Sequence, residues 1–392
     1  MQFNEISTLC AAVVMFLLGD QLVRRVGFLG RFCIPAPVVG GLIFAIAVTL
    51  LKSTGVLSIV LDTSLQSLFM VTFFTTIGLG ASFRLIKLGG KLLVVYWLMC
   101  GFLALAQNAI GVSLASVMGL HPLIGVMAGA VSMEGGHGAA AAYGQTMESL
   151  GVASAVTIGL AAATFGLVSG GLVGGPVAQY LISKHQLRPA ADEAEERLQA
   201  DKQEVAYHSF MVQIFLITLC MAVGVFLGDL FSRWTGFVLP GYVGAMFTAV
   251  IVRNLVDKLR PQAVNMHEIN LIGDVSLAIF LSMALMSIKL WELADLALPL
   301  LVIVFAQVVF IVLLAVFVLF RLLGKDFDAA VMVSGFLGHG LGATPNAMAN
   351  MGAITEKFGP SRKAFLIVPI VGAFLIDVFG MPIIITTVNL LK

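Results

Sequence analysis

Residues 132–144 read SMEGGHGAAAAYG, and they carry Glu134 and His137 among glycines although they lie between long apolar segments. A second stretch, 335–350, reads GFLGHGLGATPNAMAN and repeats the Gly-His-Gly motif 202 residues further along the chain. Glycine interrupts both stretches too often for a plain helix, and their apolar surroundings exclude a surface loop. Irregular backbone at membrane depth is tolerated only where protein buries it or where it lines a cavity. The two stretches are therefore the candidate functional site.

The composition is that of a polytopic membrane protein. The chain is 59% hydrophobic and 11% charged, with a mean hydropathy of +1.04. Soluble domains are about 45–50% apolar and about 25% charged. The chain has no basic patch with interleaved aromatic residues, so we expect no nucleic acid partner. Its four cysteines stand singly and predict no disulfide framework. The first apolar run lacks the marks of a cleaved signal peptide and is interpreted as a retained helix.

Ten apolar segments run along the chain, each near or above the length of about 20 residues that crosses a bilayer. Two of them, 37–51 and 239–252, are short and begin at or beside a proline. One strongly polar segment, 183–208, carries charges of both signs and predicts a solvated linker between two near-equal halves. The ten segments are 6–24, 37–51, 64–82, 92–118, 151–181, 209–228, 239–252, 270–288, 296–320 and 362–390.

The halves 1–182 and 209–392 correspond through a series of short matches. Gln107 in the fourth apolar segment corresponds to Gln307 in the ninth, and the two Gly-His-Gly motifs follow them. Three more matches bring the number to five, all in the same order along the two halves. They are Gly-Asp near the end of the first and sixth segments, proline and glycine in the second and seventh, and Gly-x-Pro near the end of each half. Such a series predicts an internal repeat.

The two glycine-rich stretches are expected to be re-entrant hairpins at about 122–146 and 328–352. Each half then has five spans, an odd number, so the two repeats are inverted. Placing the N-terminus outside puts 18 of the 22 Lys and Arg on one face, which the positive-inside rule makes the cytoplasmic face. We therefore expect an all-α polytopic fold with two inverted repeats of five transmembrane helices, a cytoplasmic linker, and both termini outside. The first hairpin enters from outside and the second from inside, as in secondary transporters.

The hairpin tips have the chemistry to bind a carboxylate. Thr344-Pro345 predicts a helix start with Thr344 as N-cap, and Asn346 and Asn350, one turn apart, would lie on one face of that helix. Ala139–Ala142 predict another helix start at Gly138. Helix N-termini attract anions, and glycine lets a ligand approach the backbone closely. His137 is as well explained by a buried histidine bonded within the protein. The expected substrate-binding residues are Gly135, Gly136, His137, Gly138, Gly340, Gly342, Thr344, Asn346 and Asn350.

Acidic and amide side chains inside the spans are the expected Na⁺ ligands. Glu134 and Asp377 are intramembrane acids, which are functional candidates by default. Glu134 has an alternative role in bracing the hairpin, and Gln107 and Gln307 have one in joining helices by hydrogen bonds. No transition-metal site is expected, since the two histidines come with neither HExxH nor cysteine ligands. The expected Na⁺ residues are Ser132, Glu134, Gln107, Gln307 and Asp377.

At these residues the chain resembles the bacterial sodium:glutamate symporter family. The resemblance covers nearly the whole sequence and includes PxPVVGGL at 35–42, GGHG at 135–138, ATFGLVxGGLxGGPVA at 163–178, and GLGATPxAxANMxAITEKFGPS at 340–361. It implies electrogenic, Na⁺-coupled uptake of L-glutamate across the inner membrane, with no enzymatic activity and no cofactor. It also implies distant kinship with sodium:citrate carriers, and thereby a homodimer with an elevator-like transport domain in the lipid bilayer.

The chain departs from the family pattern at the expected tips. Glu134 stands where the pattern has Ser before GGHG, Asn346 replaces a small Thr, and the run before GLGATP places His339 differently. The alternative function is therefore a Na⁺- or H⁺-coupled symporter of another carboxylate, such as a dicarboxylate or hydroxy acid. An intramembrane enzyme is disfavoured because no nucleophile accompanies Glu134 and His137. A passive channel would not need inverted broken helices.

Overall fold

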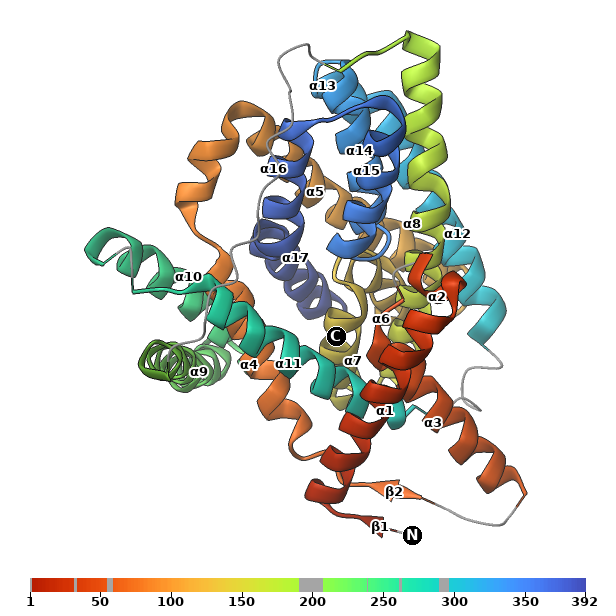
Figure 1. Cartoon of the computed structure of the whole chain (residues 1–392). Helices are drawn as coiled ribbons and strands as arrows, with labels where there is room; N and C mark the ends of the chain where they lie inside the picture. Colours follow the sequence, from red (N-terminus) through yellow and green to blue (C-terminus); the bar gives the residue numbers. More distant parts are fainter. Residues whose placement is uncertain are drawn as a thin grey trace.

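The computed structural model describes residues 2–31, 34–54, 59–189, 207–237, 239–260, 263–288 and 296–392 (Figure 1). Nearly all of this part of the chain is helical. A short parallel pairing of β1 (Gln2–Phe3) with β2 (Val60–Leu61) is added at one end. Most of the expected linker, together with Cys33 and the segment 289–295, lies outside the described residues. The predicted all-helical fold is confirmed.

Every expected span corresponds to a helix. In the first half these are α1 (Glu5–Arg25), α3 (Ala36–Ser53), α4 (Gln66–Gly80), α5 (Phe83–Val117) and α8 (Ala155–His185), with short α2 (Gly27–Arg31) after α1. In the second half they are α9 (Tyr207–Thr235), α10 (Gly241–Leu259), α11 (Met266–Met286), α12 (Ala297–Leu314) and α16–α17 (Arg362–Ile370 and Ile376–Leu391). The π-helical turn η4 (Ala315–Leu319) and α13 (Phe320–Leu322) extend α12, and η5 (Val371–Leu375) joins α16 to α17.

Seven helices of the described residues are long and apolar enough to cross a membrane. Three shorter apolar helices accompany them: Ala36–Lys52, Gln66–Gly80 and Pro122–Val131. The fourth span begins at Gly89 rather than at Phe83, because α5 breaks at Gly90, where φ is +58°. A left-handed φ is accessible to glycine at little cost. These lengths are those of a multi-pass membrane protein.

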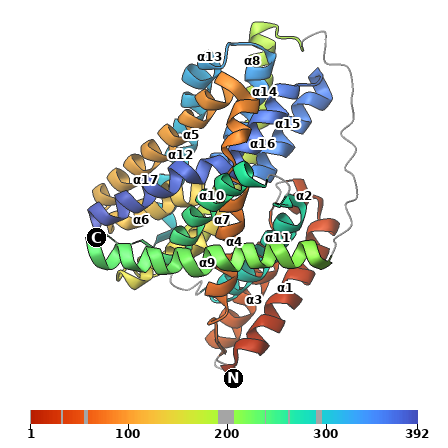
Figure 2. The same ribbon diagram turned by 90° about the vertical axis from the view of Figure 1, so that its left-hand side faces the viewer.

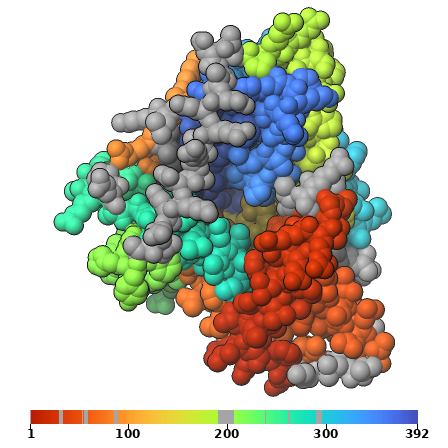
Figure 3. Space-filling model, in the orientation of Figure 1, coloured from red at the N-terminus to blue at the C-terminus, as the bar shows by residue number. Residues whose placement is uncertain are grey.

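The helices form two groups (Figures 1 and 2). In one group α1 packs on α3, α9 on α10, and α4 and α11 pack between these pairs. In the other group α8 and α5 hold the two interrupted hairpins, with α12 and α16–α17 against them. In the space-filling view the red N-terminal helices and the blue C-terminal helices occupy opposite ends of the visible face (Figure 3). The hairpins thus belong to one group of helices.

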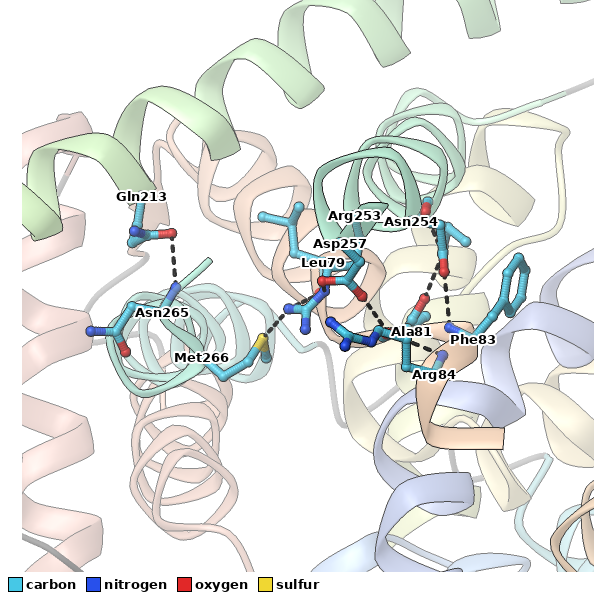
Figure 4. Close-up of polar contacts among 12 residues, drawn as sticks. Leu79, Ala81, Phe83, Arg84, Gln213, Arg253, Asn254, Asp257, Asn265 and Met266 are labelled. Carbon is cyan, nitrogen blue, oxygen red and sulfur yellow. Dashed lines mark hydrogen bonds and ion pairs between the residues drawn. The ribbon is translucent and has the colours of Figure 1, made fainter. Parts of the chain in front are cut away.

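A polar cluster fastens α10 to the connection between the groups, which runs from α4 into α5 (Figure 4). The Asn254 side chain donates to the Ala81 carbonyl at 3.0 Å and accepts from the Phe83 amide at 2.9 Å. The mostly buried Arg253 and Asp257 side chains form an ion pair at 3.0 Å on the same helix. Backbone groups left over where α4 ends and α5 begins are thereby satisfied by α10.

Candidate functional site

Both glycine-rich stretches form a helix, a break and a second helix. The first hairpin is α6 (Pro122–Val126) and the π-helical η1 (Met127–Val131), a break, and α7 (Gly136–Ser149); the second is α14 (Phe327–His339), a break, and α15 (Thr344–Phe358). The breaks meet: a Cβ built on Gly136 would lie 2.7 Å from the Gly342 carbonyl oxygen. Gly136 also has φ of +61°. The structure therefore brings the two Gly-His-Gly stretches together, backbone against backbone.

Two helix N-termini lie at this meeting point. α7 begins at Gly136, two residues before the predicted Gly138, with Gly135 as its N-cap. The prediction of Thr344 as N-cap of α15 was wrong by one residue, because Ala343 takes the extended cap conformation and Thr344 is the first helical residue. Neither Gly135 nor Ala343 has a side chain that can cap. The first turn of α7 therefore retains several amide groups that a carboxylate could accept from. That of α15 retains only the Thr344 amide, because Pro345 has no N–H and the Asn346 amide donates to the Ala343 carbonyl at 3.0 Å.

The other tip glycines are places of close packing. A Cβ on Gly138 would lie 3.2 Å from the Phe73 ring, and one on Gly340 would lie 2.6 Å from Ile311 Cδ1. One on Gly135 would lie 2.4 Å from the Ala139 Cβ. These positions need glycine because helices or the hairpin itself approach closely. Gly136 differs, since its Cβ position faces the opposite tip, whereas that of Gly342 faces Leu167 of α8 at 2.8 Å.

The buried pair Gln107 and Gln307 ties α5 and α12 to the second tip. Gln107 Nε2 donates to the Gly340 carbonyl at 2.9 Å, and Gln307 Nε2 donates to the Gln107 carbonyl at 2.8 Å. Neither Oε1 atom has a hydrogen-bond partner among the described residues. Of the two expected roles, the structure assigns both amide nitrogens to joining helices.

The two asparagines of α15 face α8. They lie one turn apart on one face, as predicted, and that face packs on another helix. Asn346 Nδ2 donates to the Leu167 carbonyl at 2.9 Å, and Asn350 Nδ2 donates to the Gly170 carbonyl at 3.0 Å. Thr344 lies on the side of α16–α17, where its Oγ1 is 3.0 Å from a Cβ built on Gly372. The asparagine amides therefore position α15.

Ser132 and His137 are satisfied within the first half of the chain. The Ser132 hydroxyl lies 2.8 Å from the Gly159 carbonyl. His137 Nε2 lies 3.0 Å from Thr164 Oγ1, whose own hydrogen is directed to the Leu160 carbonyl at 2.8 Å. His137 Nε2 is therefore the donor of this bond. The interpretation of His137 as a buried, satisfied histidine fits this geometry.

Glu134 and Asp377 lie at one enclosed cavity of about 10 Å³. Both Glu134 carboxylate oxygens are buried and have no hydrogen-bond partner in the described part of the chain. Tyr143 of α7 lines the same cavity with a hydroxyl that also lacks a partner there. The sequence reasoning missed Tyr143. Its spacing from Gly136 and Ala139, which follows one helix face, could have identified it.

A wider cavity of about 860 Å³ lies away from the tips. It is bordered by the start of α4, the end of α7, the start of α8 and the residues after α11, with hydroxyl and amide groups such as Ser67, Gln145 and Thr157. Thr157 also borders a narrower apolar cavity that reaches Thr164, the partner of His137. The two cavities thus approach the first hairpin from one end of the molecule.

Comparison with known proteins identifies the family. Residues 1–360 match the family described as Sodium/glutamate symporter. The chain belongs to this family. It is 44% identical over 382 residues to the Sodium/glutamate symporter of Escherichia coli (strain K12), covering 96% of this chain and 95% of that relative. It is 43% identical over 387 residues to that of Haemophilus influenzae (strain ATCC 51907 / DSM 11121 / KW20 / Rd), with the same coverage. The predicted membership is confirmed, and the family consists of transporters rather than enzymes.

Proposed function

We propose that the protein takes up L-glutamate with Na⁺ across the bacterial inner membrane by alternating access. The observation that carries this proposal is the meeting of two uncapped helix N-termini at Gly136 and Gly342, in a chain of the sodium/glutamate symporter family. The relatives' printed names supply Na⁺ and glutamate. Opposed helix N-termini are a suitable cradle for a substrate with two carboxylates.

Within this proposal the substrate contacts backbone more than side chains. The first-turn amides of α7 and α15 bind its carboxylates, with Thr344 beside them. Asn346 and Asn350 hold α15 on α8, since their amide nitrogens already donate to α8 carbonyls. His137 acts in the same way on the first hairpin, through Thr164. Glycine at 136 lets the two tips approach each other closely, so the substrate would meet backbone groups there instead of a side chain.

The proposal includes two inverted repeats. Helix packing supports it, because corresponding helices make corresponding contacts: α1 packs on α3 as α9 packs on α10, and α3 packs on α11 as α10 packs on α4. With both termini outside, the wide cavity between the starts of α4 and α8 opens to the outside. The hairpins at 122–146 and 328–352 then enter from opposite sides, which gives each open state a matching closed half.

We further propose that the transporter works as an elevator-like homodimer. The helix group that lacks the hairpins, α1, α3, α4, α9, α10 and α11, would be the scaffold, and the group that holds the hairpins would move against it. The packing of α4 and α11 with the other four helices defines this set. Cross-linking of purified protein at low concentration would detect the dimer.

Uptake of labelled glutamate by proteoliposomes tests the function. We expect accumulation driven by an inward Na⁺ gradient, with none when K⁺ replaces Na⁺, and stimulation by an inside-negative potential. A counterflow panel of amino acids, dicarboxylates and hydroxy acids should give the largest exchange with L-glutamate. Larger exchange with a dicarboxylate, or accumulation driven by a pH gradient alone, would instead support the alternative symporter. Equilibration without accumulation would contradict both.

A further inference from the structure

Glu134 is buried without the partners that a carboxylate needs. Neither of its side-chain oxygens accepts a hydrogen bond from any residue that the structure describes, and both are inaccessible to solvent. A buried charged group without a partner is strongly unfavourable, and it marks the place of an ion or water. The carboxylate does not brace the hairpin by a hydrogen bond, because neither of its oxygens accepts from an amide of α7 or from any other described group.

The surroundings of Glu134 add negative charge and no positive charge. The residues that border its cavity include Asp377 of α17, which interacts electrostatically with Glu134. No Lys, Arg or His is among the cavity's described lining residues. The negative charge of Glu134 also acts on Tyr96 and Cys100 of α5, and neither of these residues carries positive charge. Two acids in one apolar enclosure are stable there only with a bound cation or a bound proton.

Tyr143 borders the same cavity and adds a third oxygen-bearing side chain. Tyr143 is 1% exposed, borders the cavity, and its hydroxyl has no hydrogen-bond partner among the described residues. Two carboxyl groups and one phenol supply up to five oxygens from two helical elements. Oxygen ligands suit a hard monovalent cation, and about 10 Å³ leaves room for one particle of the size of water. The enclosure excludes a hydrated ion.

We propose that Glu134, Asp377 and Tyr143 bind one dehydrated Na⁺ between the first hairpin and α17. This site rests on the proposed Na⁺-coupled transport and narrows the expected set of Na⁺ residues. Ser132, Gln107 and Gln307 lie outside it, because none of them borders this cavity. The ion links the first hairpin to α17, and this hairpin carries one half of the substrate cradle. Na⁺ binding therefore orders the cradle before the substrate binds.

Na⁺ binding to the purified, full-length protein tests the site without relying on transport. A ligand that binds only the folded protein raises its Tm as concentration rises. We expect NaCl to raise the Tm of the native protein relative to equal KCl, and ²²Na⁺ to bind. Glu134→Gln keeps the size of the side chain and removes its charge. It should raise the NaCl concentration for half-maximal effect at least tenfold and abolish ²²Na⁺ binding. Tyr143→Phe, which removes one oxygen, should raise the NaCl concentration for half-maximal effect about threefold.

Asp274→Asn is the matched control, because Asp274 is an acid on the spanning helix α11 that does not border the cavity. Its NaCl dependence should stay within twofold of the native value. Native NaCl dependence in both Glu134→Gln and Tyr143→Phe, in variants that elute as monodisperse protein, would overturn the site. Absence of Na⁺-driven glutamate uptake by the native protein would overturn the proposed function instead, and ²²Na⁺ binding lost in Glu134→Gln would still support the site.

Discussion

The two hairpin tips share Gly-His-Gly and differ in how their polar groups are satisfied. In the second tip the side-chain amides of Asn346 and Asn350 donate to carbonyls of α8. His339 Nε2 lies 2.7 Å from the Tyr96 hydroxyl. In the first tip His137 is bonded, but the Glu134 carboxylate is left without a partner among the described residues. Asn346 Oδ1 and His339 Nδ1 of the second tip also lack partners among the described residues, but neither belongs to an acid. The difference is therefore one of charge, because only the first tip has a carboxylate to offer to an ion.

The shared histidines show that a repeated motif need not keep its contacts. His137 bonds to Thr164 of α8, in its own half of the chain. His339 bonds to Tyr96 of α5, in the other half. Each histidine fastens its hairpin, but only the second hairpin is fastened across the two halves by its histidine. Changes at matching positions should therefore have unequal effects, and the following variants measure this difference.

Gly136→Ala should have the largest effect. The left-handed conformation costs a non-glycine residue about 1–2 kcal/mol, and the new methyl would meet the Gly342 carbonyl. Misplacement of a cradle by about 1 Å can lower a rate about 100-fold, so we expect Na⁺-driven glutamate uptake to fall about 100-fold. Gly352→Ala in α15 is the control, because nothing lies within 4 Å of its Cβ position. Uptake by Gly136→Ala within twofold of Gly352→Ala would contradict the meeting of the tips.

Asn350→Asp should affect stability more than substrate affinity. The carboxylate cannot donate to the carbonyls of Gly170 and Ser334, which Asn350 contacts at 3.0 and 3.3 Å. Leaving the two carbonyls and the new carboxylate buried and unpaired should lower the free energy of unfolding by about 3 kcal/mol. This loss would be visible as a lower Tm in detergent. The KM for glutamate of the folded fraction should change less than threefold. A large KM change with a native Tm would place Asn350 in the substrate site. Asn270→Asp, on the exposed face of α11, is the control.

Gly340→Ala should be milder than Gly136→Ala. Its methyl would meet the ends of the Ile311 and Leu103 side chains at 2.6 and 2.8 Å, which can shift, and the Phe336 carbonyl oxygen at 2.8 Å. Gly340 has a right-handed φ of −76°, so the alanine adds no left-handed strain. Overpacking of this kind costs about 1–3 kcal/mol, and we expect uptake to fall about tenfold. Equal losses in the two variants would mean that both tips contact the substrate in the same way.

Thr164→Val should have the smallest effect. It removes the oxygen that accepts from His137, a loss of about 1 kcal/mol, so Tm should fall slightly and uptake less than threefold. The NaCl dependence of uptake should not change, because Thr164 does not border the cavity at Glu134. Thr218→Val is the control, since Thr218 is exposed on α9 and bonds only its own helix. A tenfold loss of uptake in Thr164→Val would assign His137 a direct role in transport.

Much of the fold was predictable because local patterns carry it. Apolar length fixed the spans, and each predicted segment is a helix. Glycine and proline fixed the breaks, although the cap of α15 is Ala343 instead of Thr344. From the sequence, Glu134 and Asp377 were both expected to be Na⁺ ligands, but nothing indicated that they lie together. The structure places both at one cavity. Inverted topology and the placement of the termini stay predictions.

The contacts of individual side chains were less predictable. Asn346 and Asn350 were correctly placed on one helix face, but the residues that this face meets, on α8, are some 180 residues away in sequence. Tyr143 carried no charge to mark it, so it was missed. Hydrogen-bond partners of a buried amide depend on which helix packs against it, and helical periodicity does not contain that information.

By itself, the sequence determined a chain that must lie in a membrane, because so apolar a composition cannot be solvated. It also determined two breaks in that chain, since clustered glycine does not sustain a helix. Only the tertiary structure decided that Gly136 meets Gly342, and that Glu134 lies unpaired beside Asp377 and Tyr143. The reason is that burial and pairing arise from contacts between helices, and the free energy of a buried charge depends on those contacts.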